Sequence, residues 1–257
     1  MGELSGKHGL VVGVANRRSI AWAIARAAAQ AGARLAVTYQ GDRLEDNVRE
    51  LAPALGEPLV LACDVTSDSQ IDDVCATIQR EFGGLDFVVH AAAFAPQAAL
   101  ANPFLETTRE GFRIALDVSA YSLIGLARSA RPLMRARGGG SILTLTYLGS
   151  ERVFPNYNVM GVAKAALEAS VRYLASDLGP ENIRVNAISA GPVKTLAAAG
   201  IAGFSNILQI YRGRAPLRRN VDSEEIAEAA MFLLGPGSRS ITGEVLFVDG
   251  GFHVTGM

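Results

Sequence analysis

Short apolar runs without polar alternation recur along this chain, and longer segments of helical period lie between them. The runs are rich in Val, Leu and Ile and occupy residues 9–14, 34–39, 59–63, 87–91, 141–146, 184–188 and 245–248. Helices are expected at residues 20–31, 70–82, 110–136, 157–178 and 223–234. Strands of this kind are buried on both faces, so the pattern predicts an α/β fold with a doubly wound parallel sheet and helices on both faces.

Chain length and composition favour a single domain that binds a small molecule. The chain has 257 residues, 49% of them hydrophobic, which is enough for one full core. We expect one domain over residues 1–257, with a substrate lid at residues 196–214, a small and apolar segment that includes Gly200 and Gly203. The net charge of −1 and the lack of a long basic run argue against nucleic acid or a membrane as partner.

The sequence also bears on the cell compartment and on metals. We expect a cytoplasmic protein, because the first residues lack a signal pattern and no apolar run could span a bilayer. Cys63 and Cys75 are expected to be buried thiols rather than a disulfide. His8, His90 and His253 are scattered without metal-ligand spacing, so we expect no metal.

The turn after the first strand has features of a nucleotide site. Gly13 lets a pyrophosphate approach the backbone, and Ser19 offers a hydroxyl beside the free amides at a helix start. The segment is not G-x-G-x-x-G, and Gly13 alone could mark an ordinary strand-to-helix turn. Its place after the first strand of such a chain favours the nucleotide hypothesis.

The next two strand ends bear on which dinucleotide is bound. Gln40 stands where an acidic residue usually meets the adenosine ribose, and Asp42 is nearby. Gln40 can bind a hydroxyl but offers no charge to a phosphate, which favours NADH over NADPH, although Arg43 leaves this open. Asp64 and Val65 could meet the adenine, or Asp64 could cap the following helix; the two interpretations are evenly balanced.

A tyrosine and a lysine have a spacing that hydride-transfer chemistry can use. If Tyr157 and Lys164 share a helix, the seven-residue step places them within about 20° of one another. A nearby ammonium would make the phenol more acidic and a better donor to a carbonyl that gains negative charge. Alone, such a pair is more often a half-buried aromatic and a solvated lysine. The nucleotide turn makes the catalytic interpretation the stronger one.

Taken in order, several segments resemble one family. From Leu4 to Phe252 the chain is similar to the bacterial NADH-dependent enoyl-acyl-carrier-protein reductases of fatty acid biosynthesis, a divergent branch of the short-chain dehydrogenase/reductases. The resemblance rests on residues 13–21, 38–40, 94–96, 108–112, 147–164, 186–196 and 243–245. It implies a Rossmann-type subunit in a homotetramer. Its implied activity is NADH-dependent reduction of the 2,3 double bond of a trans-2-enoyl thioester carried on acyl carrier protein.

The same resemblance implies residue roles. Tyr157 would bind the thioester carbonyl and stabilise the enolate formed when hydride reaches C3, and Lys164 would hold the nicotinamide ribose hydroxyls. Tyr147 would line the acyl pocket and help to position or protonate the substrate. The dinucleotide site would contain Gly13, Ser19, Ile20, Gln40, Asp64, Val65, Ala92, Lys164, Pro192, Val193, Lys194, Thr195 and Leu196. The substrate pocket would contain Tyr147 and Tyr157 with Ala95 and Met160.

Two alternatives stay open. A carbonyl (3-ketoacyl) reductase of the same superfamily would place a tyrosine four residues before the lysine, but Met160 occupies that slot. A dinucleotide-sensing protein without activity would need the nucleotide site but not a proton-donating tyrosine. The joint presence of Tyr157, Lys164 and Thr195 argues against it.

The chain also departs from its relatives. Residues 91–93 read Ala-Ala-Ala where relatives carry Ser-Ile-Gly, and residues 201–207 of the lid lack the basic residues expected to meet an acidic carrier protein. Arg212, Arg214, Arg218 and Arg219 could supply that charge instead.

Overall fold

A single parallel sheet forms the centre of the protein. The computed structural model describes residues 2–195 and 203–256. The seven strands follow the order β3-β2-β1-β4-β5-β6-β7, and every neighbouring pair is parallel. Each predicted strand is present, with ends shifted by at most a few residues. The strands are β1 (His8–Val12), β2 (Arg34–Tyr39), β3 (Leu59–Ala62), β4 (Phe87–His90), β5 (Gly140–Thr146), β6 (Ile183–Ala190) and β7 (Val245–Val248).

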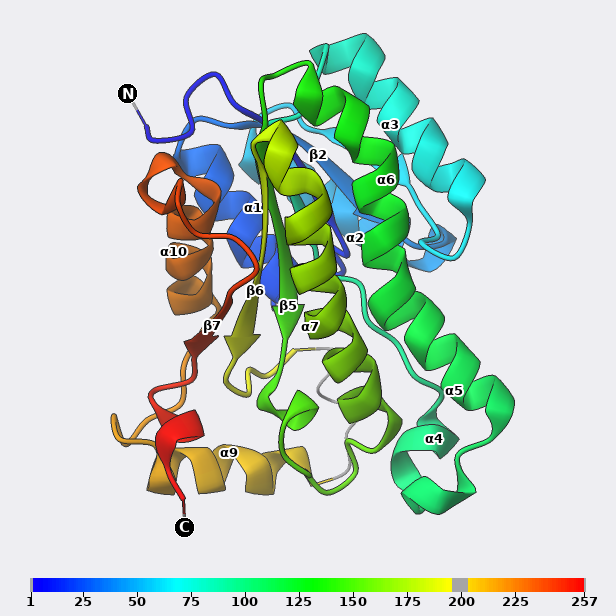
Figure 1. Ribbon diagram of the computed structural model, residues 1–257, viewed down its shortest axis with the longest axis vertical. Helices are drawn as coiled ribbons and strands as arrows, with labels where there is room; N and C mark the ends of the chain where they lie inside the picture. The colour runs from blue at the N-terminus through cyan, green and yellow to red at the C-terminus, as the bar shows by residue number, and fades with distance from the viewer. Residues whose placement is uncertain (1, 196–202, 257) are drawn as a thin grey trace.

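Helices cover both faces of the sheet, as the sequence predicts (Figure 1). One core cluster joins the sheet to α1 (Ile20–Gln30), α2 (Asp42–Leu51) and α10 (Ser223–Leu234). A second cluster on the other face joins it to α3 (Asp68–Phe82), α6 (Ser122–Arg135) and α7 (Val159–Leu178). Beyond the carboxyl ends of the strands lie α4 (Gln97–Ala101) and α9 (Phe204–Arg214), and α5 (Arg109–Leu116) leads into α6.

The strand order reverses between β1 and β4, and ligands of open α/β sheets bind at such a point. Gly13 leaves β1 here with φ +97°, and a Cβ on it would lie 2.7 Å from the carbonyl oxygen of Ala91, beyond β4. Only glycine tolerates both the positive φ and this close approach. The two strand ends can therefore lie close together at the crevice.

The helices differ from the sequence expectations in three places. The segment at 110–136 is not one helix, because a π-helical turn at Asp117–Tyr121 separates α5 from α6. The helix α2 was not expected, because it is mostly polar and buries only Val48 and Leu51. The helix expected from residue 157 begins at Val159, so Tyr157 lies in the turn before it.

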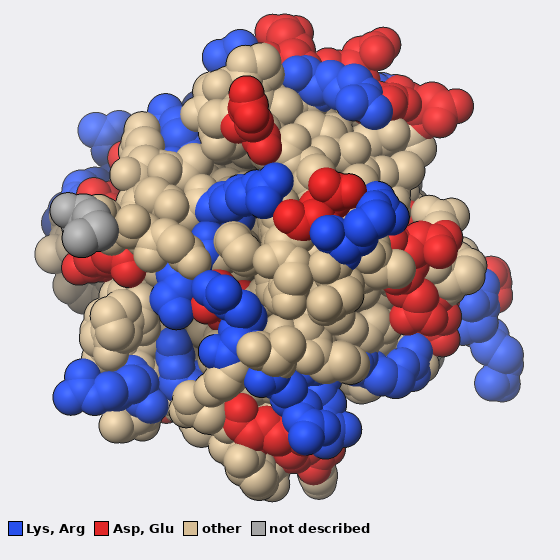
Figure 2. Space-filling view, turned by 90° about the horizontal axis from the view of Figure 1, so that it is seen from above, with Lys and Arg blue, Asp and Glu red and all other residues tan. Residues whose placement is uncertain are grey.

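Charge on the face away from the strand carboxyl ends is mixed. Figure 2 shows this face from above Figure 1, with lysines and arginines interspersed among aspartates and glutamates. No field of a single sign dominates it, in keeping with the net charge of −1. Within residues 2–195 and 203–256, no helix is both long and apolar enough to cross a bilayer.

Candidate active site

Two tyrosines meet at the carboxyl end of β5. Tyr147 directly follows this strand, and its ring lies edge to face against Tyr157, with centroids 5.0 Å apart and planes at 71°. Gly149 makes room for this arrangement, because a Cβ there would lie 2.4 Å from the Tyr157 ring. The structure thus brings together two of the predicted catalytic residues.

Tyr157 reaches this position from a turn rather than from a helix. The flanking residues Asn156 and Asn158 have φ of 62° and 42°, a region that asparagine tolerates better than most residues. The Asn158 amide donates to the carbonyl oxygens of Leu100 and Asn102, both at 2.8 Å. The helical seven-residue step is therefore the wrong explanation for how Tyr157 and Lys164 reach one site.

Lys164 is buried, with 7% of its surface exposed. Its Nζ donates to the carbonyl oxygen of Leu145 at 2.8 Å, on the strand that leads to Tyr147. Burial lowers the pKa of Lys164 to about 8, although the charge of Glu168 acts in the opposite direction. The Glu168 carboxylate itself accepts from the Thr146 hydroxyl at 2.5 Å.

Tyr157 has a weakly acidic phenol in this structure. Burial raises the pKa of Tyr157 above its ordinary value, and the charges of Tyr147 and Glu168 act in the same direction. Burial likewise raises the pKa of Tyr147. The expectation that Lys164 makes the phenol more acidic is thus wrong here. Both phenols are neutral hydrogen-bond donors at physiological pH.

His90 belongs to the packing of this region. It lies buried at the end of β4, and its ring nitrogens are 2.8 Å from the hydroxyls of Thr144 and Ser122. Burial and the nearby Lys164 lower the pKa of His90 to about 3, so its ring is neutral. Among the described residues, no three His, Cys, Asp or Glu side chains gather closely enough to hold a metal ion.

The turn after β1 places the predicted pyrophosphate residues at the amino end of α1. Ser19 is the N-cap of this helix: its hydroxyl accepts from the amide of Trp22 at 3.2 Å and donates to the carbonyl of Asn16 at 2.8 Å. Ile20 is the first helical residue and packs partly against the core. The helix start carries no acidic residue in its first turn, so its amides remain suited to an anion.

Gln40 and Asp64, two of the residues predicted to meet the adenosine, lie next to one another. They follow the neighbouring strands β2 and β3. Partial burial alone would raise the pKa of Asp64, but hydrogen bonds from Thr66 and Gln40 lower it below the ordinary value. The helix-cap alternative for Asp64 is wrong, because Ser67 caps α3. Val65 is buried in the core, so only its main chain is available to a ligand.

The remaining dinucleotide residues follow β4 and β6. Ala92 comes two residues after β4 and is partly exposed. Residues 192–195 follow β6, and the Thr195 amide donates to the carbonyl of Val193 at 2.8 Å. Within this stretch Pro192 is buried and Lys194 is exposed. Residues 196–202 of the expected lid, which include the predicted cofactor residue Leu196, lie outside the described residues.

The predicted substrate residues share one apolar cluster. Ala95 and Met160 pack in it with Tyr157 and the partly buried Tyr147. Ser119, in the π-helical turn, shares its single hydroxyl proton between the Met160 sulfur at 3.7 Å and the Phe94 carbonyl oxygen at 3.1 Å. The Ser119 hydroxyl also bonds both main-chain polar atoms of Phe94, which fixes the loop that carries Ala92 and Ala95. Ser119 is thus a structural part of the site that sequence reasoning missed.

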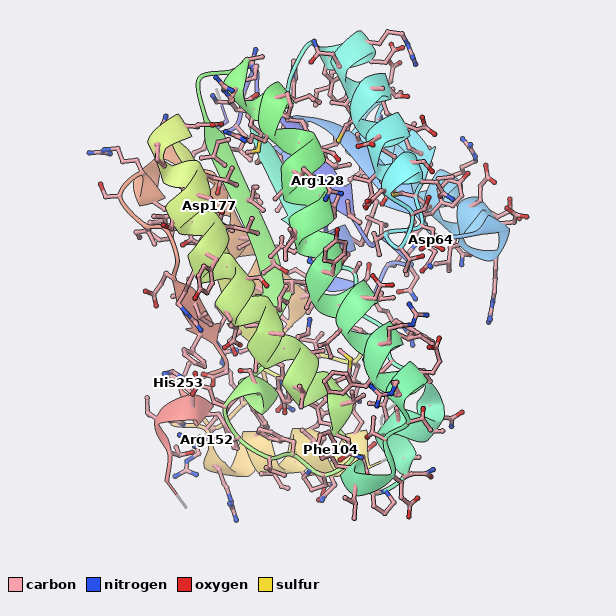
Figure 3. The ribbon with its side chains drawn as sticks, turned by 45° about the vertical axis from the view of Figure 1, so that its right-hand side comes forward. Asp64, Phe104, Arg128, Arg152, Asp177 and His253 are labelled. Atoms are coloured by element: carbon pink, nitrogen blue, oxygen red, sulfur yellow. The ribbon has the colours of Figure 1, made fainter. Side chains whose placement is uncertain are left out.

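A third tyrosine also escaped the sequence analysis. Tyr211 on α9 donates a hydrogen bond to the Tyr147 hydroxyl at 3.2 Å and is almost fully buried. Its only sequence signal is a large aromatic in the expected lid. Figure 3 shows Arg152 and His253 close together at the end of the molecule near α9, and Asp64 on the other side.

The chain matches known proteins along nearly its whole length. The family model described as enoyl-(acyl carrier protein) reductase matches residues 13–253. An NADH-dependent enoyl-acyl-carrier-protein reductase of Bacillus subtilis is 54% identical over 255 residues, covering 98% of this chain and 98% of the relative.

Solved structures give the same result. The enoyl-acyl carrier protein reductase of Bacillus cereus with NADP⁺ and indole naphthyridinone has a TM-score of 0.97 at 53% identity and covers 100% of both chains. The Anaplasma phagocytophilum reductase with NAD has a TM-score of 0.95 at 47% identity and covers 100% of this chain and 97% of that one. The chain therefore belongs to the enoyl-(acyl carrier protein) reductase family.

Proposed function

We propose that this protein reduces the 2,3 double bond of a trans-2-enoyl thioester with NADH, in fatty acid biosynthesis, with Tyr157 as the residue that binds the thioester carbonyl. The observation that carries the proposal is the pair of buried phenols beside Lys164 at the carboxyl end of β5. Family membership supports the reaction type.

The described residues fit a dinucleotide. At Gly13 a Cβ would fill the space beside Ala91, so the backbone stays open where a pyrophosphate could approach. The amino end of α1 adds amides and a partial positive charge. Gln40 and Asp64 present hydrogen-bonding groups but no cation, which favours the ribose hydroxyls of NADH over a ribose phosphate.

Each polar side chain has a distinct task in the reaction. When bound, NADH supplies the hydride that C3 of the substrate accepts. Tyr157 donates a hydrogen bond to the thioester oxygen, and this bond strengthens as negative charge develops there in the enolate. Lys164 holds the ribose hydroxyls with its ammonium, and Tyr147 positions the acyl chain or delivers a proton to the enolate. Burial excludes water and strengthens each of these contacts.

Met160 distinguishes this reaction from carbonyl reduction. A carbonyl reductase of the superfamily needs a phenol at this slot, whereas the Met160 thioether is buried and accepts a hydrogen bond from Ser119. A thioether has no proton to give. The donor that remains is Tyr157, which lies three residues before that slot in the turn that precedes α7 and suits a substrate whose reacting carbon is further from its oxygen.

The proposed assembly is a homotetramer. A shallow groove of about 660 Å³ runs along α5, the π-helical turn and α6, and Ser170 of α7 also lines it. Exposed aromatic side chains at Phe112 and Tyr121 lie in this groove. Such apolar exposure is typical of a face that another subunit covers. Sedimentation velocity would test the assembly.

The carrier protein and the compartment are part of the same proposal. Arg219 pairs with Glu225 and Arg218 donates to the carbonyl of Gly213, which leaves exposed Arg212 and Arg214 on α9 to meet an acidic carrier.

Buried, unbridged Cys63 and Cys75 support the reducing cytoplasm as the location.

The decisive assay follows the loss of NADH absorbance as the cofactor is oxidised. It is run with an enoyl thioester and, in parallel, with a 3-ketoacyl thioester. Turnover of the enoyl substrate alone is expected. Turnover of the ketoacyl substrate alone would favour the carbonyl reductase, and tight NADH binding without turnover would favour the sensor. NADPH is compared in the same assay, since one structural relative was crystallised with NADP⁺.

A further inference from the structure

Tyr211 lies directly behind the proposed catalytic pair. It projects from α9, has 1% of its surface exposed and stands with its ring 6.4 Å from that of Tyr147. The Tyr211 hydroxyl donates to the Tyr147 hydroxyl at 3.2 Å, and this bond joins residues 64 positions apart. The helix α9, which is the described part of the expected lid, is therefore in contact with Tyr147.

A stack of aromatic rings holds Tyr211 in place. Its ring lies 3.7 Å from that of Phe252 with an interplanar angle of 14°. Phe154 contacts both rings and also lies 4.9 Å from the ring of Tyr147. Tyr211 thus has little freedom to turn its hydroxyl away from Tyr147.

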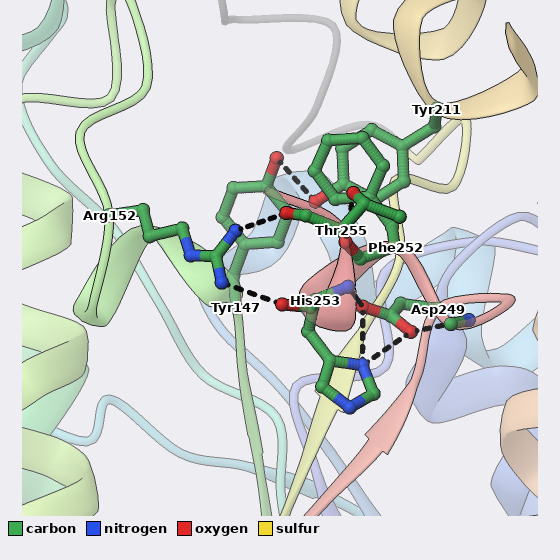
Figure 4. Close-up of polar contacts among 8 residues, drawn as sticks. Tyr147, Arg152, Tyr211, Asp249, Phe252, His253 and Thr255 are labelled. Atoms are coloured by element: carbon green, nitrogen blue, oxygen red, sulfur yellow. Dashed lines mark hydrogen bonds and ion pairs between the residues drawn. The ribbon is translucent and has the colours of Figure 1, made fainter. Parts of the chain in front are cut away.

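Polar contacts fix the C-terminal turn that carries Phe252 (Figure 4). The Asp249 carboxylate accepts from the amides of Gly251 and His253 at 2.9 and 2.8 Å and lies 3.0 Å from the His253 ring. Arg152, five residues after Tyr147, donates to the carbonyl oxygens of His253 and Thr255 at 2.7 and 2.9 Å. The turn after β5 and the C-terminal turn are therefore tied together around Tyr211.

We propose that Tyr211 is a positioning residue that fixes the hydroxyl of Tyr147 for the reaction, and that the C-terminal turn holds it there through Phe252. This inference rests on the proposed function and assigns a further residue to the same site.

The chemistry of two hydroxyls explains how Tyr211 can fix the orientation of the Tyr147 hydroxyl. Each phenol has one proton, so a proton given by Tyr211 to the oxygen of Tyr147 leaves the proton of Tyr147 directed elsewhere, where substrate can receive it. The geometry makes Tyr211 the donor of this bond, and burial raises the pKa of Tyr211, so its hydroxyl keeps the proton that it donates.

A double-mutant cycle tests the proposal. Tyr211→Phe keeps the ring that stacks on Phe252 and removes only the hydroxyl. We expect kcat with an enoyl thioester to fall about fivefold, with KM for NADH unchanged, from the loss of one hydrogen bond. In the Tyr147→Phe background the same change should have no further effect, because its target is absent. Tyr173→Phe, at a tyrosine that is 77% exposed, is the matched control and should leave kcat unchanged.

A second variant keeps the test independent of residual activity in Tyr147→Phe. Phe252→Leu disturbs the ring stack, so it should lower kcat alone but add nothing to Tyr211→Phe. Wild-type kcat in Tyr211→Phe would overturn the inference, and so would an equal loss in both Tyr147 backgrounds, which indicates a general structural effect. An inactive wild-type protein would overturn the proposed function together with the inference, whereas the other outcomes leave that function intact.

Discussion

The Nζ of Lys164 lies 2.8 Å from the carbonyl oxygen of Leu145 and ties α7 to the end of β5, two residues before Tyr147. This contact takes the place of a solvent shell around the ammonium. It satisfies one of the three donors, and among residues 2–195 and 203–256 no further hydrogen bond of this ammonium is present. Because burial lowers the pKa of Lys164 to about 8, the charge itself can be lost within an experimentally accessible pH range.

We predict that NADH binding weakens above about pH 8. The pKa of Lys164 is lowered from 10.5, so the side chain is a cation below about pH 8 and a neutral amine above it. Hydrogen bonds from a charged group exceed neutral ones by about 1 kcal/mol, which corresponds to about a fivefold rise in Kd. Fluorescence titration with NADH at a series of pH values below and above 8 measures this change in Kd. Lys164→Met should bind weakly at every pH, and a pH-dependent Kd in that variant would assign the effect to another group.

Removal of the Tyr157 hydroxyl is predicted to affect the chemical step. Tyr157→Phe keeps the ring against Tyr147 but removes the donor to the developing enolate oxygen. The loss of one such donor costs about 10²- to 10³-fold in kcat. Steady-state kinetics should show this fall with KM for NADH unchanged, and a melting temperature close to wild type would exclude misfolding. An unchanged kcat would contradict the role proposed for Tyr157.

Gly13→Ala is predicted to impair both stability and cofactor binding. The new Cβ would meet the Ala91 carbonyl at 2.7 Å, and alanine is strained at φ +97°. Gly138→Ala is the matched control, because Gly138 has φ +82° but nothing lies within 4 Å of an added Cβ. Both variants should lose about 1 to 3 kcal/mol of unfolding free energy from backbone strain. NADH titration should show a rise in Kd of about tenfold or more only for Gly13→Ala. The collision with Ala91 would push apart the ends of β1 and β4, which form the crevice. Equal affinities in the two variants would argue against a nucleotide at Gly13.

Local patterns predicted the sheet and most helices because both faces of the sheet are covered. The bounds 223–234 for α10 were correct, since Asp222 and Glu225 form a capping box and Gly235 ends the helix. The π-helical turn could not be predicted, because it depends on contacts of Ser119 with the distant Phe94.

Which candidate site residues lie together could be predicted from the sequence only in part. Gln40 and Asp64 followed from their place after neighbouring strands, and the structure joins them. The position of Tyr157 in a turn depends on the positive φ of Asn156 and Asn158. The seven-residue spacing between Tyr157 and Lys164 suggested a helix there instead. Burial, which decides the pKa of both phenols, comes from the whole fold, and the partnership of Tyr147 with Tyr211 spans 64 residues. No local pattern carries that information.

Charge at the end of α9 is predicted to act on the carrier rather than on the reaction. Arg212 and Arg214 are exposed on the last turn of this helix, where they could meet an acidic carrier protein. Reversal of both charges to glutamate should raise KM for a carrier-linked enoyl substrate about tenfold at low salt and weaken its salt dependence. With an uncharged enoyl-N-acetylcysteamine thioester, KM and kcat should stay the same, because the site around Tyr157 is untouched. Arg80→Glu, on the exposed surface of α3, controls for charge reversal alone. Equal effects on both substrates would instead place the two arginines in the fold of α9.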